Sequence, residues 1–370
     1  MGKLYVHFPF NLASRNVAIM FSLMRETSRK LCCLYSVCGL LLALSCGETQ
    51  HSNGIGNLSK WEFKMVSQGN NRPHFKTMED SIQYLPILLH YGHSVDDIQA
   101  RMGWSDKAIT SKIALLITNG FLKAKEDTLI PSLMILSERG AEKIRSDLSP
   151  LAKQIVETIL HYKDSIVKKA NAISCFKSFN ADELSLLIFS NILLDNGQLK
   201  NIEKEYLKLG RPERNNNHYY ASYQEKTNSS FEALGIYGNH VQPDSGFALC
   251  RYGNQRYISE VLEINAQVLK KYKDLQEGEL FEYPIVTPEC NIEIQALANY
   301  FKPYLIDILN KHDSHLRKGF QNSAYSKEIS YKEYFMWVYH VLYSHVTDIL
   351  VDSENIVIPA ERVSFYVFQP

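Results

Sequence analysis

The chain has 370 residues and a mass of 42.5 kDa, with 40 basic residues, 40 acidic residues and 45% hydrophobic residues. This length predicts about two domains of ordinary size, and the charge balance excludes a strongly basic nucleic-acid coat protein and an acidic disordered tail. A chain of this size can bury a core that needs neither metal ions nor disulfides. Four of the seven cysteines lie within the first 46 residues. The remaining three, Cys175, Cys250 and Cys290, are an odd number, which predicts no disulfide framework.

The N-terminal region contains an apolar run over residues 31–45, LCCLYSVCGLLLALS, preceded by the basic residues Arg25, Arg29 and Lys30. A transmembrane helix needs about 20 apolar residues, so the run is short for a permanent span. Its length and its basic flank are typical of a secretory signal. Met20 and Met24 are better starts for such a signal than Met1. A buried first helix and a membrane anchor remain as alternatives for this segment.

The end of the apolar run, ALS before Cys46, resembles the lipobox of bacterial lipoproteins. The residues next to the cysteine, Ser45 and Gly47, are small as in that family, whereas Leu44 is larger than the usual residue. In that family the cysteine receives the lipid and becomes the mature N-terminus. The resemblance therefore implies a leader over residues 1–45 and a membrane anchor at Cys46.

Residues 46–80 are rich in glycine, asparagine, serine and glutamine and show no sustained apolar period, which predicts a flexible tether. Such a tether would hold a folded domain away from the bilayer. The chain from residue 46 onward contains 35 basic and 39 acidic residues, a formal charge of −4. A mildly acidic chain has no global attraction for nucleic acid.

Residues 81–148 show the clearest succession of predicted helices. Apolar residues at helical spacing predict a first helix, and Ser94 and Ser105 are suitable N-caps for two more, over residues 95–102 and 106–118. The Asn-Gly pair that follows is a typical helix end.

Two strands are expected next, over residues 121–125 and 129–136, and Ser137 begins another helix. Helix, turn, helix, strand, strand, helix is the layout of a winged helix-turn-helix. Residues 113–122, IALLITNGFL, and residues 135–140, ILSERG, resemble the entry to the wing and the exit from it in MarR-like and ArsR-like regulators. The resemblance covers residues 81–148 and concerns the fold more than DNA binding.

By this resemblance, residues 106–118 are the recognition helix, whose polar side chains would read base edges in the major groove. The helix contains no arginine, and the expected wing tip is Glu126-Asp127, which is unfavourable beside a phosphate backbone. Contact with DNA, contact with a protein and packing within the chain therefore all remain open. The candidate contact residues are Ser105, Lys107, Thr110, Ser111, Lys112, Lys123 and Lys125.

Residues 149–175 predict a connecting amphipathic helix, with Pro150 in a favourable first-turn position. Its apolar stripe would pack either within the chain or across a homodimer.

Residues 176–370 alternate between helical and strand patterns and belong to no family that we recognise. Pro303 is expected to separate two helices, because an interior proline interrupts the hydrogen-bond ladder. Strands are expected over residues 218–224, 231–237, 247–252, 356–358 and 363–368, and helices over 182–194, 198–209, 260–275, 292–300, 304–310 and 331–350. The chain is therefore predicted to be α+β, with an N-terminal winged helix-turn-helix domain followed by a mixed helical and antiparallel-strand domain.

The sequence contains no recognised catalytic motif, phosphate-binding glycine loop or paired-cysteine zinc pattern after residue 46. His312 and His315 supply two ligands at most, whereas zinc needs three or four. We therefore predict no catalytic residues, no metal site and no cofactor, although an enzyme with scattered residues stays as a third hypothesis.

The leading hypothesis is a lipoprotein of the bacterial cell envelope that binds a protein or a glycan near the membrane. The alternative is a cytoplasmic transcriptional regulator, which would bind DNA through residues 106–118 and sense a ligand through residues 180–370.

Overall fold

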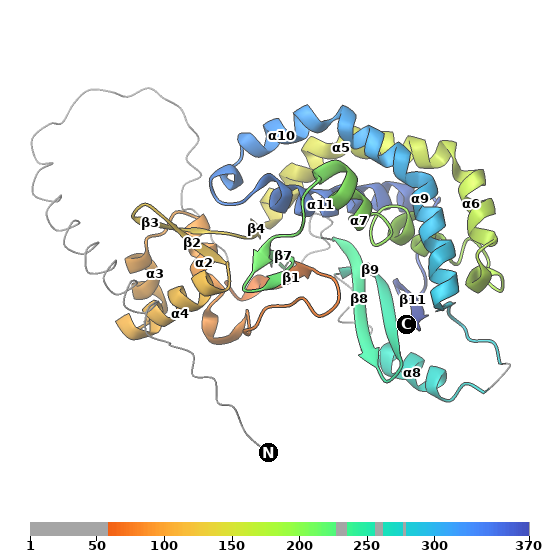
Figure 1. Cartoon of the computed structure of the whole chain (residues 1–370), viewed down its shortest axis with the longest axis horizontal. Coiled ribbons are helices and arrows are strands. Elements are labelled where there is room, and N and C mark those ends of the chain that lie inside the picture. Colours follow the sequence, from red (N-terminus) through yellow and green to blue (C-terminus); the bar gives the residue numbers. More distant parts are fainter. Residues whose placement is uncertain (1–57, 227–234, 256–261, 277–278, 370) are drawn as a thin grey trace, which may run out of the picture. The chain divides into compact units, whose positions relative to one another are not determined.

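The computed structural model describes residues 58–226, 235–255, 262–276 and 279–369 (Figure 1). The predicted leader, including Cys46, lies outside the described residues. The chain divides into two compact units, and the described helices and sheets confirm the predicted α+β class. Unit 1 contains residues 69–133 and 213–218, and unit 2 contains residues 60–68, 134–212 and 219–370.

Unit 1 is built from short helices followed by a β-hairpin, with a second small hairpin from a later part of the chain. Its apolar core is formed by Leu85, Ile98, Ile109, Ile113 and Leu116, which are buried. The elements are η2 (Glu79–Ser81), α2 (Tyr84–His90), α3 (Val95–Met102), α4 (Asp106–Thr118), β2 (Leu122–Lys125), β3 (Thr128–Pro131), β5 (Glu213–Arg214) and β6 (Asn217–His218).

The small hairpin β5–β6 is joined to the rest of unit 1 by Arg214, whose side chain is buried. Its guanidinium donates hydrogen bonds to the carbonyl oxygens of Gly120 and Ser132, the latter at 2.7 Å, and lies over the ring of Phe121. Gly120 has a φ of 68°, a left-handed conformation that favours glycine after a helix. The polar segment over residues 213–218 therefore belongs to unit 1 and packs against it.

Unit 2 contains most of the hydrophobic core, which is rich in tyrosine and leucine. Its helical elements are α5 (Glu138–His161), α6 (Lys163–Asn171), η3 (Ser174–Phe176), η4 (Leu186–Ile192), α7 (Leu199–Asn201), η5 (Ile202–Leu207), α8 (Leu262–Lys273), α9 (Pro288–Lys311), α10 (Asp313–Gln321), η8 (Ala324–Lys327) and α11 (Tyr331–Asp352). Both η4 and η5 are π-helical.

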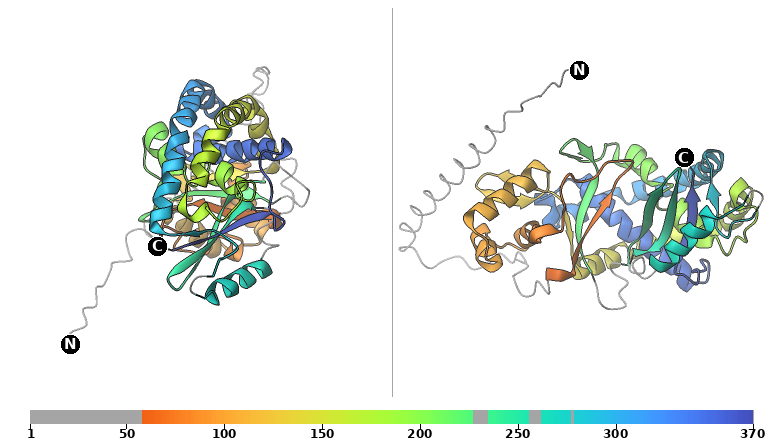
Figure 2. Two further views of the ribbon diagram at one scale, coloured as in Figure 1. Left: turned by 90° about the vertical axis from the view of Figure 1, so that its right-hand side faces the viewer. Right: turned by 90° about the horizontal axis from the view of Figure 1, so that it is seen from below.

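Two sheets lie in unit 2. The first has the order β1-β7-β4, and the second has the order β10-β11-β9-β8. Figures 1 and 2 show α8 on one side of the second sheet and long helices on the other. The strands are β1 (Trp61–Val66), β4 (Met134–Leu136), β7 (Tyr220–Glu225), β8 (Tyr237–Asp244), β9 (Phe247–Asn254), β10 (Ile285–Val286) and β11 (Val363–Phe368).

The structure corrects the predicted tether at its C-terminal end. Residues 61–66 form β1, which pairs antiparallel with β7 in the register Trp61↔Glu225, and the Trp61 side chain is buried. The strand was missed because its partner lies more than 150 residues away, and six residues carry too little periodicity to reveal it.

The predicted strand over residues 129–136 is two strands with different partners. β3 pairs with β2 in unit 1, whereas β4 pairs parallel with β7 in unit 2. The boundary between the units therefore falls after Leu133 rather than at residue 148. The helix that follows, α5, packs along α11 in unit 2, where Arg145 and Asp348 form an ion pair at 2.6 Å.

Two prolines predicted to lie at helix boundaries are inside continuous helices. Pro150 lies within α5 and Pro303 within α9. Each proline removes one backbone hydrogen bond, but both are exposed, and buried apolar residues on either side, such as Leu148 and Leu151, hold the helix against the core. Tertiary packing therefore outweighs the local penalty.

Candidate functional site

The helices α3 and α4 of unit 1 each begin at a serine cap. The Ser94 hydroxyl accepts a hydrogen bond from the backbone N–H of Asp97 at 3.1 Å, and the Asp97 carboxylate accepts one from the Ser94 N–H, which is a capping box. The hydroxyl of Ser105 accepts one from the N–H of Ala108 at 3.2 Å. Ser105, a predicted contact residue, therefore also serves as the cap of α4.

The other predicted contact residues of α4 differ in their availability. Lys107, Thr110 and Ser111 are exposed, and the Thr110 hydroxyl donates to the carbonyl oxygen of Asp106. Lys112 is half-buried; its ammonium donates to the carbonyl oxygen of Asp80 at 2.7 Å and lies 5.0 Å from the ring centroid of Trp104. Lys112 thus holds two parts of unit 1 together, which the helical spacing alone could not reveal.

The β2–β3 hairpin carries the two wing lysines of the prediction. Lys123 and Lys125 are exposed on β2, and the turn at the tip is Glu126-Asp127, where Glu126 has a φ of 53°. The tip is therefore acidic, as the sequence indicated.

Unit 1 has no excess of positive charge. Eight basic residues in the described part of unit 1 are balanced by eight acidic ones. The basic residues are Arg72, Lys76, Arg101, Lys107, Lys112, Lys123, Lys125 and Arg214, and the acidic residues are Glu79, Asp80, Asp96, Asp97, Asp106, Glu126, Asp127 and Glu213. Lys112 and Arg214 are engaged with backbone carbonyl oxygens of the unit, and Lys76 forms an ion pair with Glu79.

A groove of about 390 Å³ lies between α5 and α9 in unit 2. Its volume falls in the lower part of the range of small-ligand sites, about 300–1,000 Å³. The lining combines two tyrosines with polar side chains and one aliphatic residue: Gln154, Glu157, Thr158, His161, Tyr162, Tyr304, Asp307, Ile308 and Lys311.

Aromatic rings gather at one end of this groove. The ring centroids of Tyr162 and Tyr304 are 4.2 Å apart with an interplanar angle of 31°, and His161 meets Tyr162 edge-on at 4.6 Å. Tyr300 lies beside both tyrosines. The hydrogen bond with Tyr162 raises the pKa of the Tyr304 hydroxyl above its ordinary value. The two groove tyrosines are half-buried and are held in place by neighbouring rings.

The polar side chains of the groove are partly engaged. Asp307 and Lys311 form an ion pair at 2.6 Å, and Gln154 is hydrogen-bonded to His312 at 2.8 Å. The Glu157 carboxylate is exposed and makes no ion pair within the described parts of the chain. The groove therefore offers an uncommitted acceptor beside an aromatic surface.

A second groove of about 520 Å³ in unit 2 has a different character. It is lined by charged residues of both signs, among them Lys163, Asp164, Lys168 and Asp182, and its one aromatic residue, Phe189, is buried. The Lys163 ammonium donates to Asn355 at 2.8 Å. This groove offers no exposed ring on which a ligand could stack.

The most perturbed carboxyl group lies in the core of unit 2 and not in either groove. Burial raises the pKa of Asp195 to about 8, although a hydrogen bond with Tyr343 favours the charged form. Nearby, the Ser190 hydroxyl lies 2.5 Å from the Tyr252 hydroxyl and 2.6 Å from that of Thr347. Ser190 and Asp195 are at most 3% exposed, so this network is a buried structural element that the sequence did not indicate.

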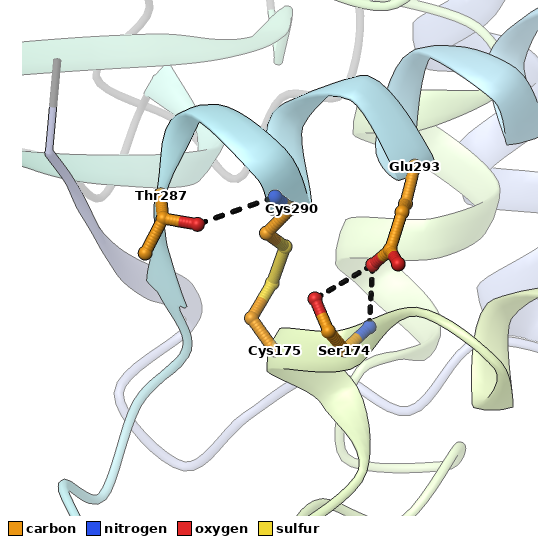
Figure 3. The surroundings of a disulfide bond; sticks show 5 residues. All are labelled: Ser174, Cys175, Thr287, Cys290 and Glu293. Atoms are coloured by element: carbon orange, nitrogen blue, oxygen red, sulfur yellow. Dashed lines mark hydrogen bonds between the residues drawn. A yellow bond between two sulfur atoms is a disulfide. The ribbon is translucent and has the colours of Figure 1, made fainter.

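Cys175 and Cys290 form a disulfide that joins η3 to the first turn of α9 (Figure 3). Their Cα atoms are 6.0 Å apart across 115 residues of sequence. The Glu293 carboxylate accepts hydrogen bonds from the N–H and the hydroxyl of Ser174, both at 2.6 Å, beside the bridge. The prediction of no disulfide framework among Cys175, Cys250 and Cys290 was therefore wrong, and Cys250 is the free, buried cysteine of the described chain.

His312, which was considered with His315 as a partial metal site, is hydrogen-bonded to Gln154, and two further histidines, His340 and His345, lie on α11. Burial lowers the pKa values of His340 and His345 to about 4, and His340 is hydrogen-bonded to the Met336 carbonyl oxygen. No group of three or more potential metal ligands occurs in the residues that the structure describes. Within the same residues, no helix combines the length and the apolar character of a membrane span.

Comparison with protein-family models, with curated proteins and with solved structures finds no match for this chain.

Proposed function

We propose that this protein is a lipoprotein of the bacterial cell envelope, anchored through Cys46, that acts by binding a partner near the membrane. Three features support the proposal: the lipobox-like end of residues 31–45, the polar residues that follow Cys46, and the disulfide in unit 2. We propose binding rather than catalysis because neither groove described in unit 2 brings together a nucleophile, a base and a perturbed carboxyl group.

The observation that carries the proposal is the pairing of Cys175 with Cys290. Disulfides persist in oxidising compartments and are rare in the cytosol of mesophilic bacteria. The bridge lies far from the leader in sequence, so it is independent of the lipobox resemblance. Both features favour export from the cytoplasm.

For unit 1 we propose a winged helix-turn-helix in which α3 and α4 are the helix pair and β2–β3 is the wing. Its charge balance favours a protein partner over DNA, because neutralisation of phosphates supplies most of the non-specific affinity of DNA-binding proteins. The hydrogen bond from Lys112 to Asp80 further weakens the case for DNA binding, because it engages one of the candidate contact residues. The exposed face of α4, with Lys107, Thr110 and Ser111, is then a protein-contacting surface.

Labelling of the native host with an alkyne fatty acid tests the anchor. The full chain is expected in the membrane fraction with the label attached, and Cys46→Ala is expected to lose the label while Cys38→Ala keeps it. Intact mass should show a lipidated chain that begins at Cys46. An unlabelled soluble chain that retains Met20 or Met24 contradicts the proposal.

The DNA-binding alternative is favoured by one observation, the exposure of Lys107, Thr110 and Ser111 on a capped helix that follows a tight turn. It predicts specific DNA binding that weakens steeply with salt and is reduced in Lys107→Ala. Fluorescence anisotropy with a library of duplex fragments, repeated at several salt concentrations, measures this directly. Absence of salt-dependent binding eliminates the alternative.

A further inference from the structure

We infer that the groove between α5 and α9 binds a neutral oligosaccharide, with one sugar ring stacked on the tyrosine pair Tyr162–Tyr304. This inference deepens the proposed function, since it names the class of partner that an envelope protein would meet. It rests on three properties of the groove: its ring faces, its hydrogen-bonding groups and its charge.

The tyrosine rings of the groove offer a surface on which a sugar ring can stack. The face of an aromatic ring carries partial negative charge, and the axial C–H groups of a pyranose carry partial positive charge, so the two surfaces attract each other in addition to excluding water. Tyr162 and Tyr304 are half-buried, with ring centroids 4.2 Å apart and ring planes tilted by 31°. Tyr300 packs against both rings and His161 against Tyr162, and these contacts limit the rotation of the pair. A rigid ring surface loses little entropy when a ligand binds.

The hydrogen-bonding groups match a polyol. A carboxylate accepts hydrogen bonds through two oxygens, which suits two neighbouring hydroxyl groups of one sugar ring. Glu157 supplies such a carboxylate without an ion-pair partner in the described chain, and Asp307 and Lys311 supply an acceptor and a donor on the α9 side. Charge-assisted hydrogen bonds of this kind are stronger than those between neutral groups.

The charge and shape of the groove favour a neutral sugar over the other chemistries. The lining contains two carboxylates and one ammonium, and that ammonium is paired with Asp307, so an anionic polymer or a phosphate finds no uncompensated cation. The one aliphatic residue of the lining, Ile308, is buried at 4% exposure, so an apolar peptide side chain has little surface to contact.

Titration of the purified full chain with three neutral trisaccharides tests the inference. The probes are cellotriose, maltotriose and tri-N-acetylchitotriose, and the detergent must lack a sugar headgroup because a glycoside detergent would compete. Isothermal calorimetry is expected to show saturable one-site binding of at least one probe, with a Kd of about 1 mM or below. Absence of saturation by all three up to about 10 mM overturns the inference.

Variants locate the binding site. Tyr304→Ala removes the stacking ring and is expected to weaken binding about tenfold or more, whereas Tyr304→Phe keeps the ring and is expected to bind as the wild type does. Glu157→Gln changes an exposed residue and should weaken binding by about fivefold to tenfold. Lys168→Ala in the second groove is the matched control, with unchanged affinity.

The outcomes separate this inference from the proposed anchor. Wild-type affinity in both Tyr304→Ala and Glu157→Gln overturns the groove as the site even when a sugar binds. Loss of affinity in those variants supports the inference even if the chain proves not to be lipidated, since the titration does not depend on Cys46. Fatty-acid labelling without sugar binding leaves the anchor intact and removes the sugar site.

Discussion

The two units place their polar side chains in opposite ways. Unit 1 has a mainly aliphatic core around the buried ring of Phe121, and with few exceptions its charged groups lie on its surface, where serine side chains cap α3 and α4. Unit 2 buries a carboxyl group, a histidine and several tyrosine hydroxyls in its core and is cross-linked by a disulfide. The difference predicts that the stability of unit 2 depends on pH and redox state, whereas that of unit 1 depends on local caps and apolar packing.

Core packing in unit 2 gives the largest expected effect. Phe301 on α9 is fully buried, so Phe301→Ala leaves a cavity and is expected to lower the free energy of unfolding by about 3–5 kcal/mol. Ile292 on the same helix is 71% exposed, and Ile292→Ala should change it by no more than about 0.5 kcal/mol. Urea unfolding of both variants measures the difference, and equal values contradict the packing of α9.

The disulfide is expected to have the next largest effect. Replacement of Cys175 and Cys290 by alanine removes a cross-link over 115 residues and should cost about 2–4 kcal/mol. The wild type should lose stability on addition of a reductant, whereas the double variant should not respond. Cys250→Ala is the control, because this free thiol takes no part in the bridge. A wild-type chain that is indifferent to reductant would show that the bridge is not formed.

The pH dependence of unfolding distinguishes the buried groups of unit 2. Asp195 has a pKa of about 8 in the folded state and about 3.9 when unfolded, so the folded chain keeps a proton that the unfolded chain releases, and stability falls as pH rises toward 8. His340 and His345 have pKa values near 4, below the unfolded value of about 6.5, so stability also falls as pH drops below about 6.5.

The two effects together predict maximum stability near pH 6.5. Between about pH 6.5 and 8 the wild type should lose about 2 kcal/mol through Asp195. The variant Asp195→Asn keeps the shape of the side chain without an ionisable proton, so this alkaline loss should disappear. Thermal unfolding across the pH range checks the prediction, and an identical profile for the two chains would assign the pH dependence to other groups.

Helix capping in unit 1 gives the smallest effect. Ser94→Ala removes both the acceptor of the Asp97 N–H and the capping box of α3, and we expect a loss of about 1 kcal/mol. Ser111→Ala on the exposed surface of α4 is the matched control, with a change within about 0.5 kcal/mol. If both substitutions cost the same, the caps of unit 1 do not set its stability.

Local signals in the sequence predicted much of unit 1 and little of the groove in unit 2. The helices over residues 95–102 and 106–118 agree with α3 and α4 because their serine caps and glycine ends act within a few residues. The groove was missed because its residues on α5 and on α9 are about 150 positions apart. The tyrosines in the sequence give no sign that two of their rings meet.

The sequence by itself determined the α+β class, the caps of α3 and α4 and the long apolar helix α11, because periodicity, caps and turn residues depend on near neighbours. Only the tertiary structure decided that Trp61 begins a sheet strand, that Cys175 pairs with Cys290 and that Pro150 and Pro303 lie inside helices. These features depend on contacts between residues far apart in the chain. Packing energy from such contacts exceeds the local preferences that the sequence displays.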